Sequence, residues 1–263
     1  MDMRCSAVAR VEGFPTVGTA GDQRGFLLVD WPLPWPADIA AIAELAPVHE
    51  AARQAGVRVQ AVVPHGGTAR VVLYRRPDGP GFAGYDRTAS VAPAAGVVEA
   101  ALALLAMELL ADPAVRDAGY AVGRTSHTGG HRFAPTAIVL PQGTMWAHLD
   151  RGTVARILRR TGPVADVLAL YRGSTGIGAP ALQALERHAF AEIGWGWLDW
   201  RREGREVSEG VVALAGDAPT GERAAWEAVV TSRARPVPDC GKPLAEARKE
   251  SPEPVIVAWR RTA

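Results

Sequence analysis

Short apolar runs punctuated by proline and glycine predict strands and loops in the first third of the chain. FLLVDW is such a run, and the prolines that follow it at 32, 34 and 36 cannot donate hydrogen bonds within a sheet. VRVQAVV and ARVVLY also have strand composition, and the PHGGT between them predicts a turn. The predicted elements are strands over 26–31, 57–63 and 69–74, a helix over 37–56 interrupted near Pro47, and a loop over 75–84.

Helical and strand patterns both continue through the rest of the chain. Residues 97–111 are apolar nearly all round, which predicts a buried helix. Asp150 is placed to cap a helix in RGTVARILRR, whose last turn carries arginines where the helix dipole favours positive charge. The other predictions are a hairpin around PQGT at 141–144, a helix over 179–192 and a strand-rich segment from 194 onward. Together these patterns predict an α/β protein with a mixed sheet and flanking helices.

Composition and charge narrow the class of protein. The 263 residues are 48% hydrophobic and 22% charged, which is enough apolar material for a full core. The formal net charge is +1 and the arginines are scattered, so we expect no nucleic-acid partner. The chain contains two cysteines, Cys5 and Cys240, and this excludes a disulfide framework.

The sequence offers no pattern for export or membrane insertion. The first residues, MDMRCSAVARVEG, lack the long apolar core of a signal peptide. The most apolar run, 97–110, contains Glu99 and Glu108 and is too short to cross a bilayer. We therefore expect a cytoplasmic protein without a membrane partner.

The strongest candidate for chemistry is SHTGGHRFA, in which three residues separate His127 from His131. Histidines at this spacing share one face of a helix, but Gly129 and Gly130 make a helix unfavourable here. We expect a loop that enters a strand and is tight enough to turn both rings toward one point. A helical zinc-protease motif is excluded, because Thr128 stands where that motif has its glutamate. Spacing alone leaves two interpretations open, metal ligands or hydrogen-bonded residues of a turn.

Other patterned stretches favour structural roles. GSTGIGAP at 173–180 lacks a Walker lysine and a clear preceding strand, so we prefer a turn to a phosphate site. Trp195 and Trp197 alternate as on one packed face of a strand, and with Trp200 they are expected to join the core. The sequence shows no nucleophile elbow and no patterned pair of catalytic carboxylates, so it predicts no enzyme class.

Several stretches occur together, in a consistent order, along most of the chain. They are Cys5-Ser6, PTVGTA at 15–20, RGFLLVDWPLPW at 24–35, GVRV at 56–59, VVLYRRP at 71–77, SHTGGHRFA at 126–134, YRGSTGI at 171–177 with Gln183 and Glu186, and DCGKP at 239–243. In this combination the chain resembles the sucrase/ferredoxin-like family, a group related to thioredoxin-like 2Fe-2S ferredoxins. SHTGGHRFA is the most specific of the matches.

The resemblance implies a thioredoxin-like α/β fold and an electron-transfer or redox function. In related proteins an H-x3-H segment supplies two ligands to a 2Fe-2S cluster, and the positions that match it are His127 and His131. Neutral imidazoles in place of thiolates leave more positive charge on the cluster and raise its potential toward about −150 to +300 mV, as in Rieske centres. A redox protein would be the implied partner.

The chain departs from the family at the cysteines. Where relatives carry a cysteine-rich segment, this sequence has VAPAAGVVEAAL, with Pro93 near the first cysteine position and Ala101 or Leu102 near the second. Thr125 replaces a cysteine found in some relatives just before the Ser-His pair at 126–127. Proline, alanine and leucine have no atom that can bind iron.

Cys5 and Cys240 would restore a count of two cysteines and two histidines, which suits a Rieske-like site. Both match family positions outside the ligand segment, however, and two buried structural thiols are the more ordinary interpretation. We therefore predict a divergent member that binds the 2Fe-2S cluster weakly or not at all. The alternatives are a single divalent metal ion at His127 and His131, favouring zinc, and a cofactor-free binding or scaffolding module.

The expected domain organisation has three parts. Residues 1–90 form an N-terminal α/β portion, 91–193 a thioredoxin-like portion with the histidine loop, and 194–263 a strand-rich C-terminal extension. The sequence does not indicate which oligomeric state the protein has.

Overall fold

The computed structural model describes residues 5–64, 68–98, 100–101, 125, 129–237, 245 and 249–263. The chain divides into two compact units, each built from separate stretches. Unit 1 comprises Met1–Asp22, Gly79–Ala83 and Gly129–Ala263, and unit 2 comprises Gln23–Asp78 and Gly84–Thr128. The three consecutive domains expected from the sequence stay a prediction. The expected mixed α/β class with a strand-rich C-terminal segment is confirmed.

A mixed sheet forms the centre of unit 2. Its described strands are β1 (Gly25–Asp30), β2 (Val57–Val62), β3 (Ala69–Arg75) and β4 (Asp86–Ala92), in the order β2-β1-β3-β4. The described helical segments are η1 (Ile39–Ala41), η2 (Ala43–Leu45), α2 (Ala46–Gln54) and η3 (Ala94–Gly96). β1 runs parallel to β2 because the chain crosses over through α2, and it runs antiparallel to β3. Pro47 lies in the first turn of α2, where the missing N–H is tolerated.

Three of the strands in unit 2 were predicted, and their pairing was not. The apolar runs 26–31, 57–63 and 69–74 form β1, β2 and β3, but β1 lies between the other two. β4 has the sequence DRTASVA, in which partly buried and exposed side chains alternate, and its one apolar residue larger than alanine, Val91, is exposed. Its pattern is therefore too weak to predict a strand. Of the helix predicted over 97–111, residues 97–98 and 100–101 are helical, and the remainder lies outside the described residues.

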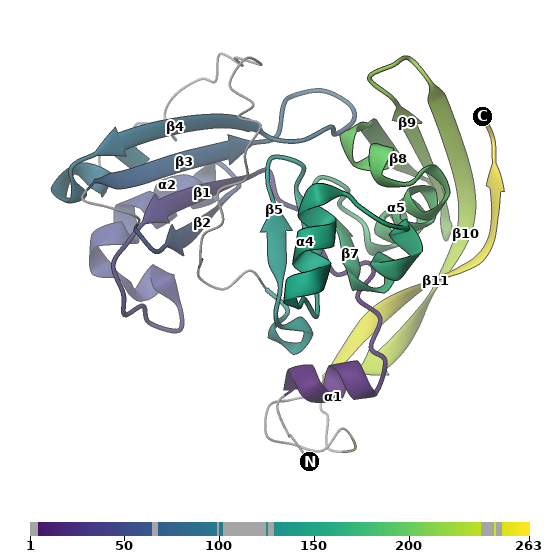
Figure 1. The fold of residues 1–263 in the computed structure, drawn as a ribbon, viewed down its shortest axis with the longest axis horizontal. Coiled ribbons are helices and arrows are strands. Elements are labelled where there is room, and N and C mark those ends of the chain that lie inside the picture. The colour runs from purple at the N-terminus through teal and green to yellow at the C-terminus, as the bar shows by residue number, and fades with distance from the viewer. Residues whose placement is uncertain are drawn as a thin grey trace. The chain divides into compact units, whose positions relative to one another are not determined.

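Unit 1 contains two sheets. The described strands of the smaller sheet are β5 (Ala137–Val139), β6 (Thr144–Trp146) and β7 (Tyr171–Ser174), and those of the larger are β8 (Arg201–Ser208), β9 (Val211–Asp217), β10 (Arg223–Pro236) and β11 (Glu250–Arg261). The described helices are α1 (Cys5–Val11), α4 (Arg151–Arg159), α5 (Pro180–Ile193), η5 (His131–Phe133), η6 (Val164–Asp166), η7 (Leu168–Leu170) and η8 (Trp195–Asp199). α5 packs against both sheets and lies beside β9 to β11 in Figure 1. None of the helices in the described stretches is long and apolar enough to span a membrane.

The helix and hairpin predictions for unit 1 are confirmed. The Asp150 carboxylate accepts a hydrogen bond from Thr153 N at 2.8 Å, and Thr153 Oγ1 accepts one from Asp150 N at 2.9 Å, so the pair caps α4. β5 and β6 form the antiparallel hairpin predicted around 141–144. The helix predicted over 179–192 is α5, with Pro180 in its first turn.

The tryptophan-rich stretch GWGWLDW lies in the core, as expected, but it does not form a strand. Gly194 adopts φ +83° at the end of α5, and the chain then winds into the short helix η8. Trp197 and Trp200 are buried in the core of unit 1, and Trp195 packs against that core from a partly buried position. A glycine with positive φ ends a helix readily, and this break sets the backbone that follows it.

A loop between two strands of unit 2 contributes to unit 1. Phe82 belongs to the short stretch Gly79–Ala83 and is 1% exposed. Arg202 N in β8 donates to Phe82 O at 2.9 Å, and the Phe82 ring lies against Gly176. Unit 1 is thus completed by a residue that the sequence places inside the predicted loop over 75–84.

Candidate functional site

The histidine loop is the stretch SHTGGHRFA at 126–134. Its described part is a tight turn followed by one turn of 3-10 helix. His127 lies outside the described residues, and His131 is the first residue of η5. Gly129 and Gly130 have φ values of +91° and +70°, a region that favours glycine. A Cβ on Gly130 would meet Phe133 Cδ2 at 2.9 Å, so glycine is required there by space as well as by conformation. The predicted loop that enters a strand is confirmed for residues 129–139.

Arg172 from β7 holds this turn in place. The residue is 3% exposed, and its Nη1 donates to Gly129 O at 3.1 Å. Its Nε and Nη2 donate to Thr19 Oγ1 and Thr19 O at 2.9 and 2.6 Å. The guanidinium carbon also lies 5.2 Å from the centre of the Phe133 ring. One buried cation therefore ties the histidine loop to the N-terminal segment of unit 1.

Arg172→Met is expected to loosen the histidine loop. The change removes charge-assisted hydrogen bonds to backbone oxygens, so amide exchange at Gly130 and Phe133 should accelerate roughly tenfold or more. Hydrogen–deuterium exchange followed by mass spectrometry measures this. The control is Arg156→Met, which removes an exposed contact to Asp166 and should leave the loop unchanged. Equal protection in wild type and Arg172→Met would contradict the assignment.

The N-terminal helix brings a thiol to this region. α1 packs against η5, and Ala9, Phe14, Phe133 and Ala147 form a small apolar cluster between them. Cys5 is 4% exposed and lies one helical turn before Ala9 on the same buried face. Burial lowers the pKa of Arg132, and the nearby Cys5 acts in the opposite direction. Cys240 lies outside the described residues.

His148 also contacts the histidine loop, and sequence reasoning missed it. Its N donates to Phe133 O at 2.8 Å, and its ring packs edge-on against Phe133 at 5.8 Å between centres. Burial lowers the pKa of His148, and the charges of Arg10 and Arg172 lower it further, while a hydrogen bond with the Ala134 backbone opposes them. His148 follows β6, so only the pairing of β5 with β6 brings it here. No spacing motif in the sequence signals that contact.

A second polar cluster lies between β7, α5 and β8. Arg202 Nη1 donates to Glu186 Oε1 at 2.8 Å and to Ser174 Oγ at 2.8 Å, and both charged side chains are completely buried. Ser174 N donates to Glu186 Oε2 at 3.0 Å. Burial, and then the Glu186 charge, raise the pKa of Tyr171 well above its ordinary value. The cluster is closed off from solvent, and its hydrogen bonds join two sheets and a helix, so we assign it a structural role.

The phosphate-like glycine stretch is part of the same structural region. The sequence suggested that no strand precedes it, and this is wrong, because β7 runs directly into it. The Asp22 carboxylate lies 2.8 Å from where a Cβ of Gly178 would be, and a carboxylate there disfavours an anion. Gln183 Nε2 donates to Ala20 O at 2.7 Å and to Ile177 O at 2.8 Å, so it fixes the turn. The preference for a turn fits this geometry.

One comparison with known proteins found a match, to the segment that precedes this turn. The model of the sucrase/ferredoxin-like family matches residues 91–173. Residues 91–173 are similar to that family. The segment contains the histidine loop and ends within β7, so the expected resemblance is confirmed for this part of the chain. No curated protein and no solved structure matches the chain.

The residues at the positions where the resemblance leads us to expect cysteines do not fit a four-ligand cluster. Pro93 is exposed at the end of β4, and Ala101 is completely buried in the apolar core of unit 2. Leu102 lies outside the described residues. Thr125 Oγ1 donates to Ala61 O at 3.0 Å and serves a backbone contact. None of these side chains can supply the thiolates that a 2Fe-2S cluster needs beside its histidines.

Proposed function

We propose that the protein is a divergent relative of the thioredoxin-like 2Fe-2S redox proteins that no longer holds a stoichiometric cluster. The observation that carries the proposal is the chemistry of the residues at the positions where the family has cysteines. Ala101 is packed in an apolar core of valines and leucines, and the side chain of Pro93 is a hydrocarbon that cannot bind iron. Arg172 and the two glycines still shape the histidine loop. On this proposal, the chain has kept the histidine half of the family's ligand set and lost the cysteine half.

A single metal ion at His127 and His131 is the second candidate. The packing of α1 against η5 favours it, because this contact carries the Cys5 side chain toward the histidine loop. Two imidazoles and one thiolate form a ligand set that suits zinc, with the fourth position filled by water. When bound, zinc would supply a Lewis acid or a structural tie between the loop and α1.

The proposed setting is the cytoplasm, without a nucleic-acid or membrane partner. A redox partner protein belongs to the proposal only if iron is bound, because zinc carries no electron. If neither metal is bound, the remaining function is that of a binding or scaffolding module built on a redox fold.

Metal and sulfide analysis of the purified protein separates these functions. We expect a nearly colourless protein with far less than two irons and two labile sulfides per chain, even after expression with ample iron. Zinc close to one per chain, lost in His127→Ala and His131→Ala, would select the single-ion site. Cys5→Ser tests the third ligand, and His65→Ala is the matched control.

Two results would overturn parts of the proposal. Strong visible absorption with two irons per chain would show that a cluster is held and that its thiolates come from elsewhere. Equal metal content in wild type and both histidine variants would leave only the binding module.

A further inference from the structure

α1 is a short helix that a small apolar contact holds against η5. It has seven residues, and an isolated helix of this length is unstable in water. Its buried residues are Cys5 and Ala9. Ala9 belongs to a small buried cluster with Phe14, Phe133 and Ala147. The structure of α1 therefore depends on few side chains outside the helix itself.

A glycine turn ends the helix. Gly13 has φ +60°, and its N donates to Arg10 O at 3.2 Å. Phe14 N donates to Ala9 O at 2.9 Å, so the two bonds form a Schellman motif that packs Phe14 back onto the helix. Apart from the chain neighbours of Gly13, no described atom lies within 4 Å of a Cβ placed on it. Residues 5–14 thus form one local structure, closed by its own hydrogen bonds.

The residues that follow this turn are anchored in unit 1. Thr16 Oγ1 lies 2.8 Å from Ala169 O and 3.0 Å from Tyr171 O, within hydrogen-bonding distance of both. Gly18 N donates to Arg172 O at 3.0 Å. The boundary between the weakly held and the strongly held part of the N-terminal segment therefore lies just before Thr16.

Residues 5–14 cover one side of the histidine loop. Phe133 is 1% exposed and packs against Ala9 and Phe14. Both ring nitrogens of His148 are shielded from solvent. Burial, and then the charge of Arg10, lower the pKa of His148, which shows that α1 lies near this imidazole. Opening of residues 5–14 would uncover the Phe133 ring and remove the Arg10 charge from His148.

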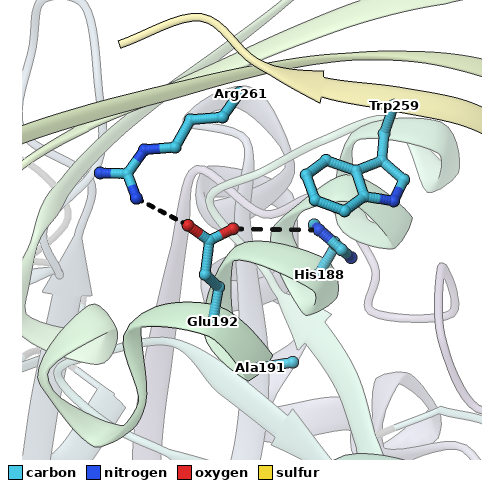
Figure 2. A pocket seen from close by; sticks show the side chains of 5 residues that line it. All are labelled: His188, Ala191, Glu192, Trp259 and Arg261. Carbon is cyan, nitrogen blue, oxygen red and sulfur yellow. Dashed lines mark hydrogen bonds and ion pairs between the residues drawn. The ribbon is translucent and has the colours of Figure 1, made fainter.

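The outer strand β11 of unit 1 is fixed more firmly. It pairs with β10 along its length, and Glu192 of α5 accepts a hydrogen bond from Arg261 Nη1 at 2.7 Å. The His188 and Trp259 rings lie 3.9 Å apart between centres, and Figure 2 shows both contacts between α5 and β11. α5 and β11 therefore serve as a reference for segments that open only when the core of unit 1 unfolds.

We propose that residues 5–14 are a lid over the histidine loop, which opens by local unfolding while the rest of unit 1 stays folded. Opening breaks the Schellman turn, and the anchor at Thr16 keeps the lid attached. A local opening of this kind costs less free energy than global unfolding, because it exposes little buried surface. The open form gives a ligand or partner access to the Phe133 side of the loop, and the closed form denies it.

Native-state hydrogen exchange of the full chain tests the lid. The amides of Glu12 and Phe14 should exchange at least about a hundredfold faster than the hydrogen-bonded amides of α5. Urea below the unfolding transition should leave their rate unchanged, since a local opening exposes little surface. Gly18 N should stay protected. EDTA is present throughout, because Cys5 is a ligand in the second candidate function, so the lid and the metal site are tested separately.

A variant that holds the lid open gives a second test. Ala9 is completely buried beside Phe133, so Ala9→Arg should displace α1. In a Cys240→Ser background, Cys5 should then react with a thiol reagent at least about tenfold faster. The matched control is Val11→Arg, which changes a 68% exposed residue of the same helix and should react like the background protein. Thermal unfolding checks that both variants keep the core of unit 1.

Either of two results would refute the lid. Exchange at Glu12 and Phe14 that depends on urea as steeply as exchange in α5 would show that residues 5–14 open only with the core. Equal thiol reactivity in Ala9→Arg and Val11→Arg would show that displacing α1 uncovers nothing. The exchange measurement needs no variant, so it decides the question even where Ala9→Arg does not fold.

Discussion

Arg202→Met is expected to lower the free energy of unfolding by about 3–5 kcal/mol, because it leaves the buried Glu186 carboxylate without its cation. Glu186 and Arg202 are both completely buried, and the Nη1 to Oε1 distance is 2.8 Å. A carboxylate in such a place cannot recover the lost interaction from water. Urea denaturation followed by tryptophan fluorescence measures the change in free energy.

A double variant separates charge from packing. Glu186→Gln removes the negative charge and keeps an oxygen that can accept the hydrogen bond from Ser174 N. We expect Glu186→Gln combined with Arg202→Met to recover at least about half of the lost stability. If the double variant is as unstable as Arg202→Met alone, the loss arises from packing around the guanidinium instead. Arg223→Met, which removes an exposed pair with Asp217, is the control and should change stability by less than about 1 kcal/mol.

Gly176→Ala is expected to destabilise unit 1 by about 1–3 kcal/mol through overpacking. A Cβ at this position would lie 2.2 Å from Cγ of Phe82, a distance that the buried ring cannot accommodate without moving. Thermal unfolding gives the size of the effect. Gly196→Ala is the matched control, because the nearest atom to its Cβ is 3.9 Å away.

A smaller side chain at position 82 should restore part of that stability. Phe82→Leu removes part of the ring that the new methyl group would strike, so Gly176→Ala with Phe82→Leu should be more stable than additivity predicts. Additive losses in the double variant would show that the two residues do not meet.

Local patterns in the sequence predicted most elements but few of their partners. The apolar run 26–31 and the cap at Asp150 depend on neighbouring residues alone, and both predictions are confirmed. The placement of β1 between β2 and β3 depends on a crossover, which a strand pattern does not contain. The stretch after Gly194 was predicted as a strand from alternating tryptophans. Gly194 instead has a positive φ, and the residues after it form the short helix η8.

The sequence also predicted only part of the candidate site. The two glycines of the histidine loop predicted a tight turn, and their positive φ values agree. Arg172 and His148 reach the loop only through β7 and the β5–β6 hairpin, so no spacing in the sequence identifies them. The ligand roles of His127 and His131 stay a prediction.

The interleaved chain segments of unit 1 affect how the protein can form during synthesis. The Thr16 hydroxyl donates a hydrogen bond to Ala169 O at 2.8 Å, and the Phe82 backbone pairs with that of Arg202. Thr16 and Phe82 therefore cannot form these contacts until residues more than a hundred positions later have been synthesised. Unit 2 lies between these segments and holds most of its contacts within 23–128. On the ribosome, unit 2 can therefore fold first, while α1 stays without its binding surface until η5 and Ala147 emerge.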